Sequence, residues 1–183
     1  MTEELTAQAL EQRIKTVRDH IRLENAHDLP AIMDTFGAAA RYDDEPWGEH
    51  HTGREAVRSF YEQLLRALPD LQIEVRQEHS SPAGVVLECV IRGTHGGPWR
   101  GLPATGRRLE FPLCGVYTFG PDGKLAGEKI YYDRATVLAQ IGLFREPTST
   151  AGRLLALLNH PVTVIGAWLR GPGGRRRPAR DSG

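Results

Sequence analysis

The sequence contains few cysteines and none of the spacings typical of a bound zinc ion. Its 183 residues include two cysteines, Cys89 and Cys114, without a CxxC pair or a His-x-x-x-His spacing. No structural metal site is therefore predicted. Both cysteines lie in apolar, strand-like runs, which indicates small buried hydrophobic residues in a reducing compartment.

The charges show no excess of either sign. The chain has 23 basic and 23 acidic residues, so its formal net charge is zero. A neutral chain offers no general electrostatic attraction to nucleic acid, and no nucleic-acid partner is predicted. The N-terminal stretch MTEELTAQALEQRIK is polar and lacks the apolar core of a signal peptide. We therefore expect a cytoplasmic protein.

The sequence also lacks an apolar run long enough to cross a membrane. Its most apolar stretch, RLLALLNHPVTVIGAWL at 153–169, has a polar middle and a proline, whereas a bilayer span needs about 20 apolar residues. We interpret 145–170 as an apolar helical extension and 171–183 as a basic, disordered tail. We expect the extension to pack on the rest of the chain or to contact a second copy in a homodimer. The alternative is contact with a membrane surface, helped by the arginines of the tail.

Residues 1–144 form one predicted domain, in which helices precede strands. Apolar residues recur at three- and four-residue spacing over 6–26, 28–36 and 53–68, which predicts three helices. From Leu71 onward the period is two, which predicts antiparallel strands after a short early strand near Tyr42. This order predicts an α+β fold, a cone in which helices cover one face of a curved sheet around a cavity. The predicted later strands cover 71–79, 85–95, 107–119 and 124–133, and a last helix covers 134–144.

Three motifs occur in a fixed order along this domain. They are HTGREAVRSFYEQLLRALPDL at 51–71, IRGTHGGPWRGLPATGRRLEF at 91–111 and DGKLAGEKIYYD at 122–133. Together they resemble the SnoaL-like polyketide cyclases of the nuclear transport factor 2-like superfamily, over about residues 10–143. The resemblance implies a cone-shaped fold and acid/base chemistry without a cofactor. This superfamily also hosts isomerases, epoxide hydrolases and non-catalytic binders, so the resemblance bears more directly on fold than on reaction.

Asp133 is the acid/base residue that the resemblance implies. It ends the last predicted strand, in phase with Lys129 and Tyr131, and the resemblance turns that face toward the cavity. Burial among apolar groups raises the pKa of a carboxyl group, which can then transfer protons near neutral pH. Asp133 also stands where an aspartate caps the following helix, and the two roles are compatible.

The strand ending in IRGTH offers two further candidates. His95 either hydrogen-bonds a substrate carbonyl at the cavity mouth or satisfies backbone groups of the glycine-rich loop that follows. Arg92 either contacts the substrate or faces solvent on the other side of the strand. Strict alternation places the two side chains on opposite faces, so both reach the cavity only if a bulge at Gly93 intervenes.

Tyr42 and Asp44 lie two residues apart on the short early strand and therefore share a face. Tyr42 either polarises a substrate carbonyl through its hydroxyl or is a half-buried packing residue. This stretch, Arg92 and Asp133 also resemble the pocket of limonene-epoxide hydrolases. Thr94 replaces a second aspartate of that family, and Asp44 replaces its asparagine. The sequence therefore lacks the second aspartate that this family uses to activate water.

Aromatic and histidine side chains surround the expected cavity mouth. Trp47, His50 and His51, before the third helix, are expected to gate or floor the pocket. A tryptophan such as Trp99 is more often a packing residue than a substrate contact. If it faces the cavity, it suits a flat or hydrophobic ligand. His50, His51 and His95 are candidate metal ligands, but neighbouring histidines rarely bind one ion, and no metal is predicted.

The sequence thus predicts a cyclase- or isomerase-type enzyme that uses no cofactor and acts on a small hydrophobic, polyketide-like molecule. Its predicted catalytic residues are Asp133, His95 and Tyr42. The alternatives are epoxide hydrolysis around Asp133, Arg92 and Tyr42, and a non-catalytic ligand-binding or association module. The predicted substrate contacts are Arg92, Asp44, Trp47, His51, Trp99 and Tyr131.

Overall fold

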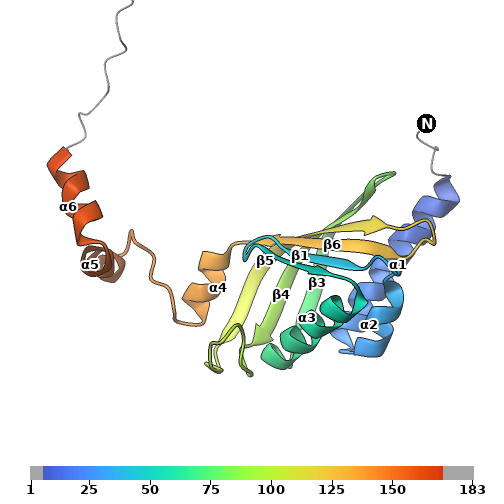
Figure 1. The fold of residues 1–183 in the computed structure, drawn as a ribbon, viewed down its shortest axis with the longest axis horizontal. Coiled ribbons are helices and arrows are strands. Elements are labelled where there is room, and N and C mark those ends of the chain that lie inside the picture. Colours follow the sequence, from blue (N-terminus) through green and yellow to red (C-terminus); the bar gives the residue numbers. More distant parts are fainter. Residues whose placement is uncertain (1–5, 171–183) are drawn as a thin grey trace, which may run out of the picture. The chain divides into compact units, whose positions relative to one another are not determined.

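Residues 6–170 are the part of the chain that the computed structural model describes, and the predicted tail at 171–183 lies outside them. The chain divides into two units, Met1–Leu143 and Phe144–Gly183, each of which is described by itself. In the first unit, helices lie against one face of a curved sheet (Figure 1). The helices are α1 (Ala7–Asn25), α2 (Leu29–Thr35), α3 (Arg54–Ala67) and α4 (Arg134–Gln140).

Polar side chains fix where the short helices begin. Asp28 accepts a hydrogen bond from the Ala31 amide at the start of α2, and Pro30 lies in its first turn. Asp133 does the same at the start of α4, as the sequence predicts. These caps satisfy amide groups that have no partner within the helix.

The sheet has six strands in the order β2-β1-β6-β5-β4-β3. Neighbouring strands are antiparallel except for β1 and β6, which are parallel. The predicted α+β architecture is confirmed, and β2 has no counterpart among the strands that the sequence predicts. The strands are β1 (Arg41–Asp44), β2 (Glu49–Thr52), β3 (Gln72–Ser81), β4 (Gly84–Thr94), β5 (Arg108–Phe119) and β6 (Leu125–Tyr132).

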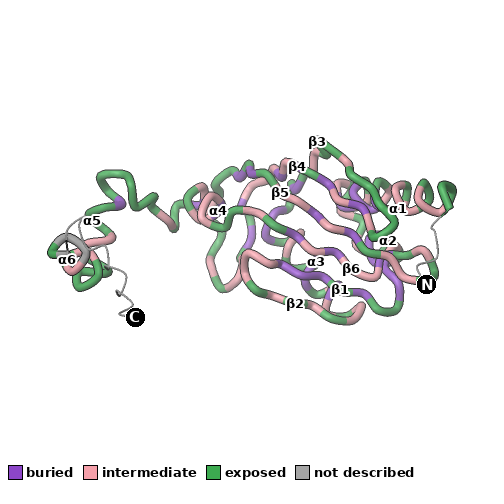
Figure 2. The backbone as a smooth tube through the Cα atoms, turned by 90° about the horizontal axis from the view of Figure 1, so that it is seen from above, coloured by how far each residue is buried: buried purple, intermediate pink, exposed green. Residues whose placement is uncertain are grey.

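The core lies between the sheet and the helices. In β4, Leu87 and Ile91 are buried while Glu88, between them, is exposed, as expected for a strand with one covered face. Helix α1 contributes Val17 and Ile21 to the same core, and α3 contributes its own buried stripe. Figure 2 shows this alternation of buried and exposed residues along the central strands.

The second unit contains α5 (Thr150–Asn159) and α6 (Pro161–Arg170). Pro161 is the first residue of α6, a position where its missing amide hydrogen costs nothing. Leu154, Leu158 and Val162 are exposed. Among the described residues, no helix has both the length and the apolarity to span a bilayer. That this unit contacts a second copy or a membrane surface stays a prediction.

The alternation in β4 predicts how two neighbouring substitutions differ. Leu87 is 1% exposed, so Leu87→Ala leaves a cavity and lowers the free energy of unfolding by about 2–5 kcal/mol. Glu88→Ala, on the outer face, changes it by less than about 0.5 kcal/mol. Urea unfolding followed by circular dichroism measures both, and equal effects would contradict the assigned strand phase.

Candidate active site

An apolar cavity lies between the concave face of the sheet and the helices α1 and α3. Its volume is ≈ 60 Å³, below the roughly 300–1,000 Å³ of typical ligand sites, so a ring-sized ligand enters only if wall side chains move. The polar residues of its wall include Asp44 and Tyr132 on one side, and Glu24 and Glu128 on another. Its apolar wall includes Ile21, Phe60, Leu64, Ile73, Ile91, Trp99, Phe111 and Ile130.

The inward-facing residues of β6 are one position out of phase with the prediction. Glu128, Ile130 and Tyr132 line the cavity, while Tyr131 is 46% exposed. The prediction that Lys129, Tyr131 and Asp133 face the cavity is therefore wrong. The sequence alternates equally well in either phase, and the pairing of Ile130 with β5 and β1 decides which face is covered.

Asp133 lies beyond the end of β6, on the surface. Its carboxylate accepts hydrogen bonds from the Ala135 amide, at 2.9 Å, and from the hydroxyl of Thr136, at 2.6 Å. These bonds hold the pKa of Asp133 below its ordinary value, the opposite of a carboxyl tuned for proton transfer near neutral pH. The predicted helix cap is confirmed, and the predicted position in the cavity is wrong.

Arg92 also lies outside the cavity. Its guanidinium pairs with Glu74 at 2.5 Å and Glu110 at 3.1 Å on the outer face of the sheet. The register between β4 and β5 runs through Gly93 without a shift, so no bulge turns Arg92 inward. The prediction that Arg92 contacts a substrate in the cavity is therefore wrong, and solvent-facing Arg92, the alternative, is confirmed.

His95 is fully buried but does not line the cavity. Its Nδ1 lies 3.1 Å from the hydroxyl of Thr105, within the glycine-rich loop. Burial lowers the pKa of His95, so its imidazole is neutral at pH 7. His95 therefore holds the loop in place beside Trp99, whose ring centroid lies 6.4 Å away. Its predicted position at the cavity mouth is wrong.

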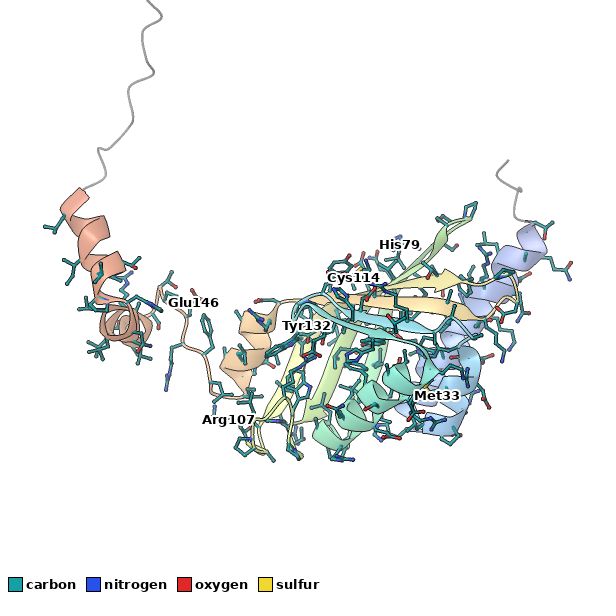
Figure 3. All side chains as sticks on the ribbon, viewed as in Figure 1. Met33, His79, Arg107, Cys114, Tyr132 and Glu146 are labelled. Atoms are coloured by element: carbon teal, nitrogen blue, oxygen red, sulfur yellow. The ribbon has the colours of Figure 1, made fainter. Side chains whose placement is uncertain are left out.

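Asp44 is the carboxyl group that the structure places in the cavity wall with a cation beside it. Its Oδ2 accepts hydrogen bonds from Arg100 Nη2 at 2.5 Å and from the Tyr132 hydroxyl at 3.2 Å. The indole of Trp47 in turn donates to the Tyr132 oxygen at 2.8 Å. Figure 3 marks Tyr132 near the α4 end of the sheet. Asp44 Oδ1 is buried and has no hydrogen-bond partner within the described part of the chain.

The environment of Asp44 acts on its charge in two opposite ways. Burial raises its pKa, and the Arg100 guanidinium lowers it, with burial the larger effect. Arg100 itself lies over the rings of Trp47 and Trp99, at 4.5 and 5.0 Å from their centroids, and also pairs with Glu49. The result is a partly desolvated ion pair at the cavity wall.

Tyr42 lies beside Asp44 on β1, and both line the cavity, so their predicted common face is confirmed. The Tyr42 ring stacks on Phe60 at a centroid distance of 4.0 Å. Burial raises the pKa of Tyr42 well above its ordinary value, so its hydroxyl keeps its proton. His51 lies behind this pair, 4.9 Å from the Phe60 ring. It lines a separate surface hollow that Trp99 and Arg100 share.

A second polar group is buried between α1, α3 and the sheet. His20 Nε2 lies 3.3 Å from Glu128 Oε2 and 3.7 Å from Glu24 Oε1. The hydroxyl groups of Tyr61 and Tyr117 donate to Glu128, at 2.7 and 3.3 Å. By spacing, the three titratable side chains of this cluster could also hold a metal ion. Buried Asp43, half-buried Glu45 and exposed His50 have similar spacing.

Sequence reasoning missed most of these groups. His20 and Glu24 are one helical turn apart and in phase with the apolar residues Val17 and Ile21, and charged groups in an apolar stripe are a usable signal. The sequence contains no signal that Arg100 faces inward. Arg100 lies in a loop, and a loop has no periodic pattern that separates inward from outward side chains. Trp47 and Trp99, which the sequence predicts as substrate contacts, are the two residues whose rings lie against Arg100.

The sequence model of the SnoaL-like polyketide cyclases matches residues 14–141. This chain belongs to the SnoaL-like polyketide cyclase family. The matched residues cover α3 and all six strands, and therefore the whole cavity wall. Membership supports a cyclase-type enzyme. A comparison with curated proteins found no match.

Solved structures similar to this SnoaL-like chain share its fold. AclR, a putative hydroxylase from Streptomyces galilaeus, is 23% identical with a TM-score of 0.65, over 74% of this chain and 99% of its own. A putative SnoaL-like polyketide cyclase from Jannaschia sp. CCS1 is 21% identical with a TM-score of 0.65, over 76% and 97%. An NTF2-like protein of unknown function from Burkholderia pseudomallei is 17% identical with a TM-score of 0.62, over 72% and 98%. The fold is therefore the predicted nuclear transport factor 2-like fold.

The two arginines predict a clear contrast in stability. Arg100→Gln leaves Asp44 buried without its cation and lowers the free energy of unfolding by about 3–5 kcal/mol. Arg92→Gln removes ion pairs on the outer face, where the side chain is 40% exposed, and lowers it by about 0–1 kcal/mol. Chemical denaturation at pH 7 compares them, and a larger loss for Arg92→Gln would contradict the assignment of the buried pair.

Proposed function

We propose that this chain catalyses proton transfer at a carbon next to a carbonyl group of a small apolar, polyketide-like molecule, without a cofactor. Such a step is needed both for ring closure by an aldol-type reaction and for isomerisation of an unsaturated ketone. The observation that carries the proposal is the carboxyl group of Asp44. One of its oxygens is held by Arg100 and Tyr132, and the other is buried in an apolar cavity with no partner among the described residues.

Asp44 is the general base in this proposal. Arg100 keeps the carboxylate ionised, while burial raises its pKa and makes it a stronger base than an exposed aspartate. The hydrogen bonds to Oδ2 fix the orientation of the group, so the free Oδ1 is available to take the proton. Tyr42, which lines the same wall and keeps its hydroxyl proton, is placed to polarise the substrate carbonyl.

The apolar wall defines the class of substrate. Aromatic and aliphatic side chains surround the polar groups, which suits a hydrophobic ring more than a charged metabolite. Because the cavity is small, substrate binding displaces part of the wall. Trp99 belongs both to this wall and to the loop that carries Arg100, which makes that loop the expected place of movement.

The two alternative functions fit this geometry less well. Epoxide hydrolysis as the sequence suggested it would gather Asp133, Arg92 and Tyr42 around one water molecule. Of these, Tyr42 lines the cavity, whereas Asp133 and Arg92 have their partners on the surface. A non-catalytic binding module would use the apolar wall but has no need for a desolvated carboxylate paired with Arg100, which is costly to bury.

The proposal predicts a contrast between two aspartates. Asp44→Asn removes the base and lowers the rate of deuterium exchange at the carbons next to the carbonyl of cyclohexanone by about 10²–10⁴-fold. Asp133→Asn alters an exposed helix cap and leaves that rate within about twofold of the wild type, at some cost in stability. Proton NMR in D₂O, with enzyme-free exchange subtracted, measures both rates.

The reverse result would overturn the proposal. If Asp133→Asn abolishes exchange and Asp44→Asn does not, the base lies outside the cavity. If the wild type binds cyclohexanone but exchanges no protons above background, the chain is a binding module and not an enzyme of this class.

A further inference from the structure

The polar cluster around His20 lies at a different part of the cavity from Asp44. The inward side chains of β6 run from Glu128 through Ile130 to Tyr132. Tyr132 contacts Asp44, and Glu128 contacts His20. Glu128 and Tyr132 are four residues apart on β6, a backbone span of roughly 13 Å at about 3.3 Å per residue, and both side chains line the same cavity. A substrate bound against Ile130 therefore lies between two carboxyl-containing groups.

The hydrogen bonds of His20 determine where its protons are. The Thr35 hydroxyl donates to the Ile32 carbonyl at 2.6 Å, so its oxygen is an acceptor for His20 Nδ1 at 2.7 Å. Nδ1 therefore carries a proton, and Nε2 is the atom that gains or loses one. That atom lies 3.1 Å from the Tyr61 hydroxyl and also faces the carboxyl groups of Glu128 and Glu24.

Glu128 and Glu24 differ in the partners they have. Glu128 accepts hydrogen bonds from the Tyr61 and Tyr117 hydroxyl groups, which stabilise its charged form. Glu24 Oε2 is buried and has no hydrogen-bond partner within the described residues, and Glu24 lines the cavity. A protonated His20 would neutralise the charge of Glu128, and Glu24, which lacks such hydrogen bonds, is then the carboxyl group that keeps its proton more readily.

The electrostatic surroundings of Glu24 agree with this placement. Burial raises its pKa from 4.5 to about 7, against the lowering effect of His20. Neighbouring carboxylates raise the pKa of His20 even though burial lowers it. The titratable groups around Glu24 are His20 on α1, Tyr42 on β1, Tyr61 on α3, Cys89 on β4, Tyr117 on β5 and Glu128 on β6.

We propose that Glu24 is a second catalytic residue, a general acid that hydrogen-bonds the substrate oxygen and donates a proton to it, with His20 and Glu128 as positioning residues. This inference rests on the proposed function of the cavity. Glu24 fits the role because it lines the apolar cavity, its Oε2 has no hydrogen-bond partner among the described residues, and His20 Nε2 lies 3.7 Å from its Oε1. A carbonyl oxygen is the ligand group that such a protonated carboxyl recognises.

The step balances without a further reactant. The carbon–hydrogen bond next to the carbonyl breaks, and its proton goes to Asp44. The electron pair forms a carbon–carbon double bond as the carbonyl π bond breaks, and the oxygen takes the proton of Glu24. The product is an enol, and the Glu24 carboxylate that remains lies 3.7 Å from protonated His20 Nε2. The reverse transfers restore both groups once the enol carbon has reacted.

Glu24→Gln tests the proposal, with Glu11→Gln on the exposed face of the same helix as the matched control. We expect Glu24→Gln to lower kcat for cyclohexanone deuterium exchange at least about 100-fold. The wild-type rate falls above about pH 7 as Glu24 loses its proton, and this limb of the pH profile disappears in the variant. Glu11→Gln keeps both the rate and the limb.

Binding of phenol, an enol-shaped probe, gives a readout that does not depend on turnover. Calorimetry should show at least about tenfold weaker phenol binding to Glu24→Gln than to the wild type, because the amide does not reproduce the acid's hydrogen bond. If the amide variant fails to fold, Glu24→Asp withdraws the acid by about 1.5 Å and is expected to weaken binding in the same direction.

The outcomes separate this proposal from the proposed function. If Asp44→Asn abolishes exchange but Glu24→Gln keeps the wild-type rate, pH profile and phenol affinity, the general acid is overturned and the base stands. If phenol binding depends on Glu24 but the wild type exchanges no protons, the oxygen-binding role is supported and the proposed reaction is overturned. Unchanged rate and binding in Glu24→Asp would also overturn the role of Glu24.

Discussion

The burial of three carboxyl groups in an apolar interior is the constraint on which the rest of this site depends. Glu24, Asp44 and Glu128 are each at most 4% exposed, and an isolated buried carboxylate is costly. A different interaction offsets the cost of burying each of these carboxyl groups. Asp44 has an arginine, Glu128 has two tyrosine hydroxyls and a histidine, and Glu24 has the raised pKa that favours its neutral form.

Strand β6 contributes to both polar clusters of the cavity. Its inward side chains Glu128 and Tyr132 belong to the two polar clusters, and Ile130 between them faces the space that a ligand would fill. Helix α1 brings Glu24 to one cluster, and β1 brings Asp44 to the other. The architecture thus brings a carboxyl group with a raised pKa and a carboxyl group paired with an arginine to one apolar space, and the proposed proton transfer rests on this arrangement.

The sequence predicted the fold more fully than the site. Long periodic segments and capping residues such as Asp133 determine local structure, so the three helices and the main strands were found. The phase of β6 was not, because Lys129-Tyr131 and Glu128-Ile130 alternate alike, and only pairing with β1 and β5 covers one face. Tyr42 and Asp44 were found because strand geometry alone places them on one face. Arg100 comes to Asp44 from a loop 56 residues away, a contact without local signal.

The most direct test of this account is the titration of individual carboxyl groups by carbon-13 NMR of the folded protein. The account predicts that Glu24 titrates near its raised pKa of about 7. It also predicts that the pKa of Asp44 lies above 3.8 and that of Asp133 below it. A pKa for Glu24 near the ordinary 4.5, together with a raised pKa for Asp133, would contradict it. The acid/base centre would then lie at the surface helix cap and not in the cavity.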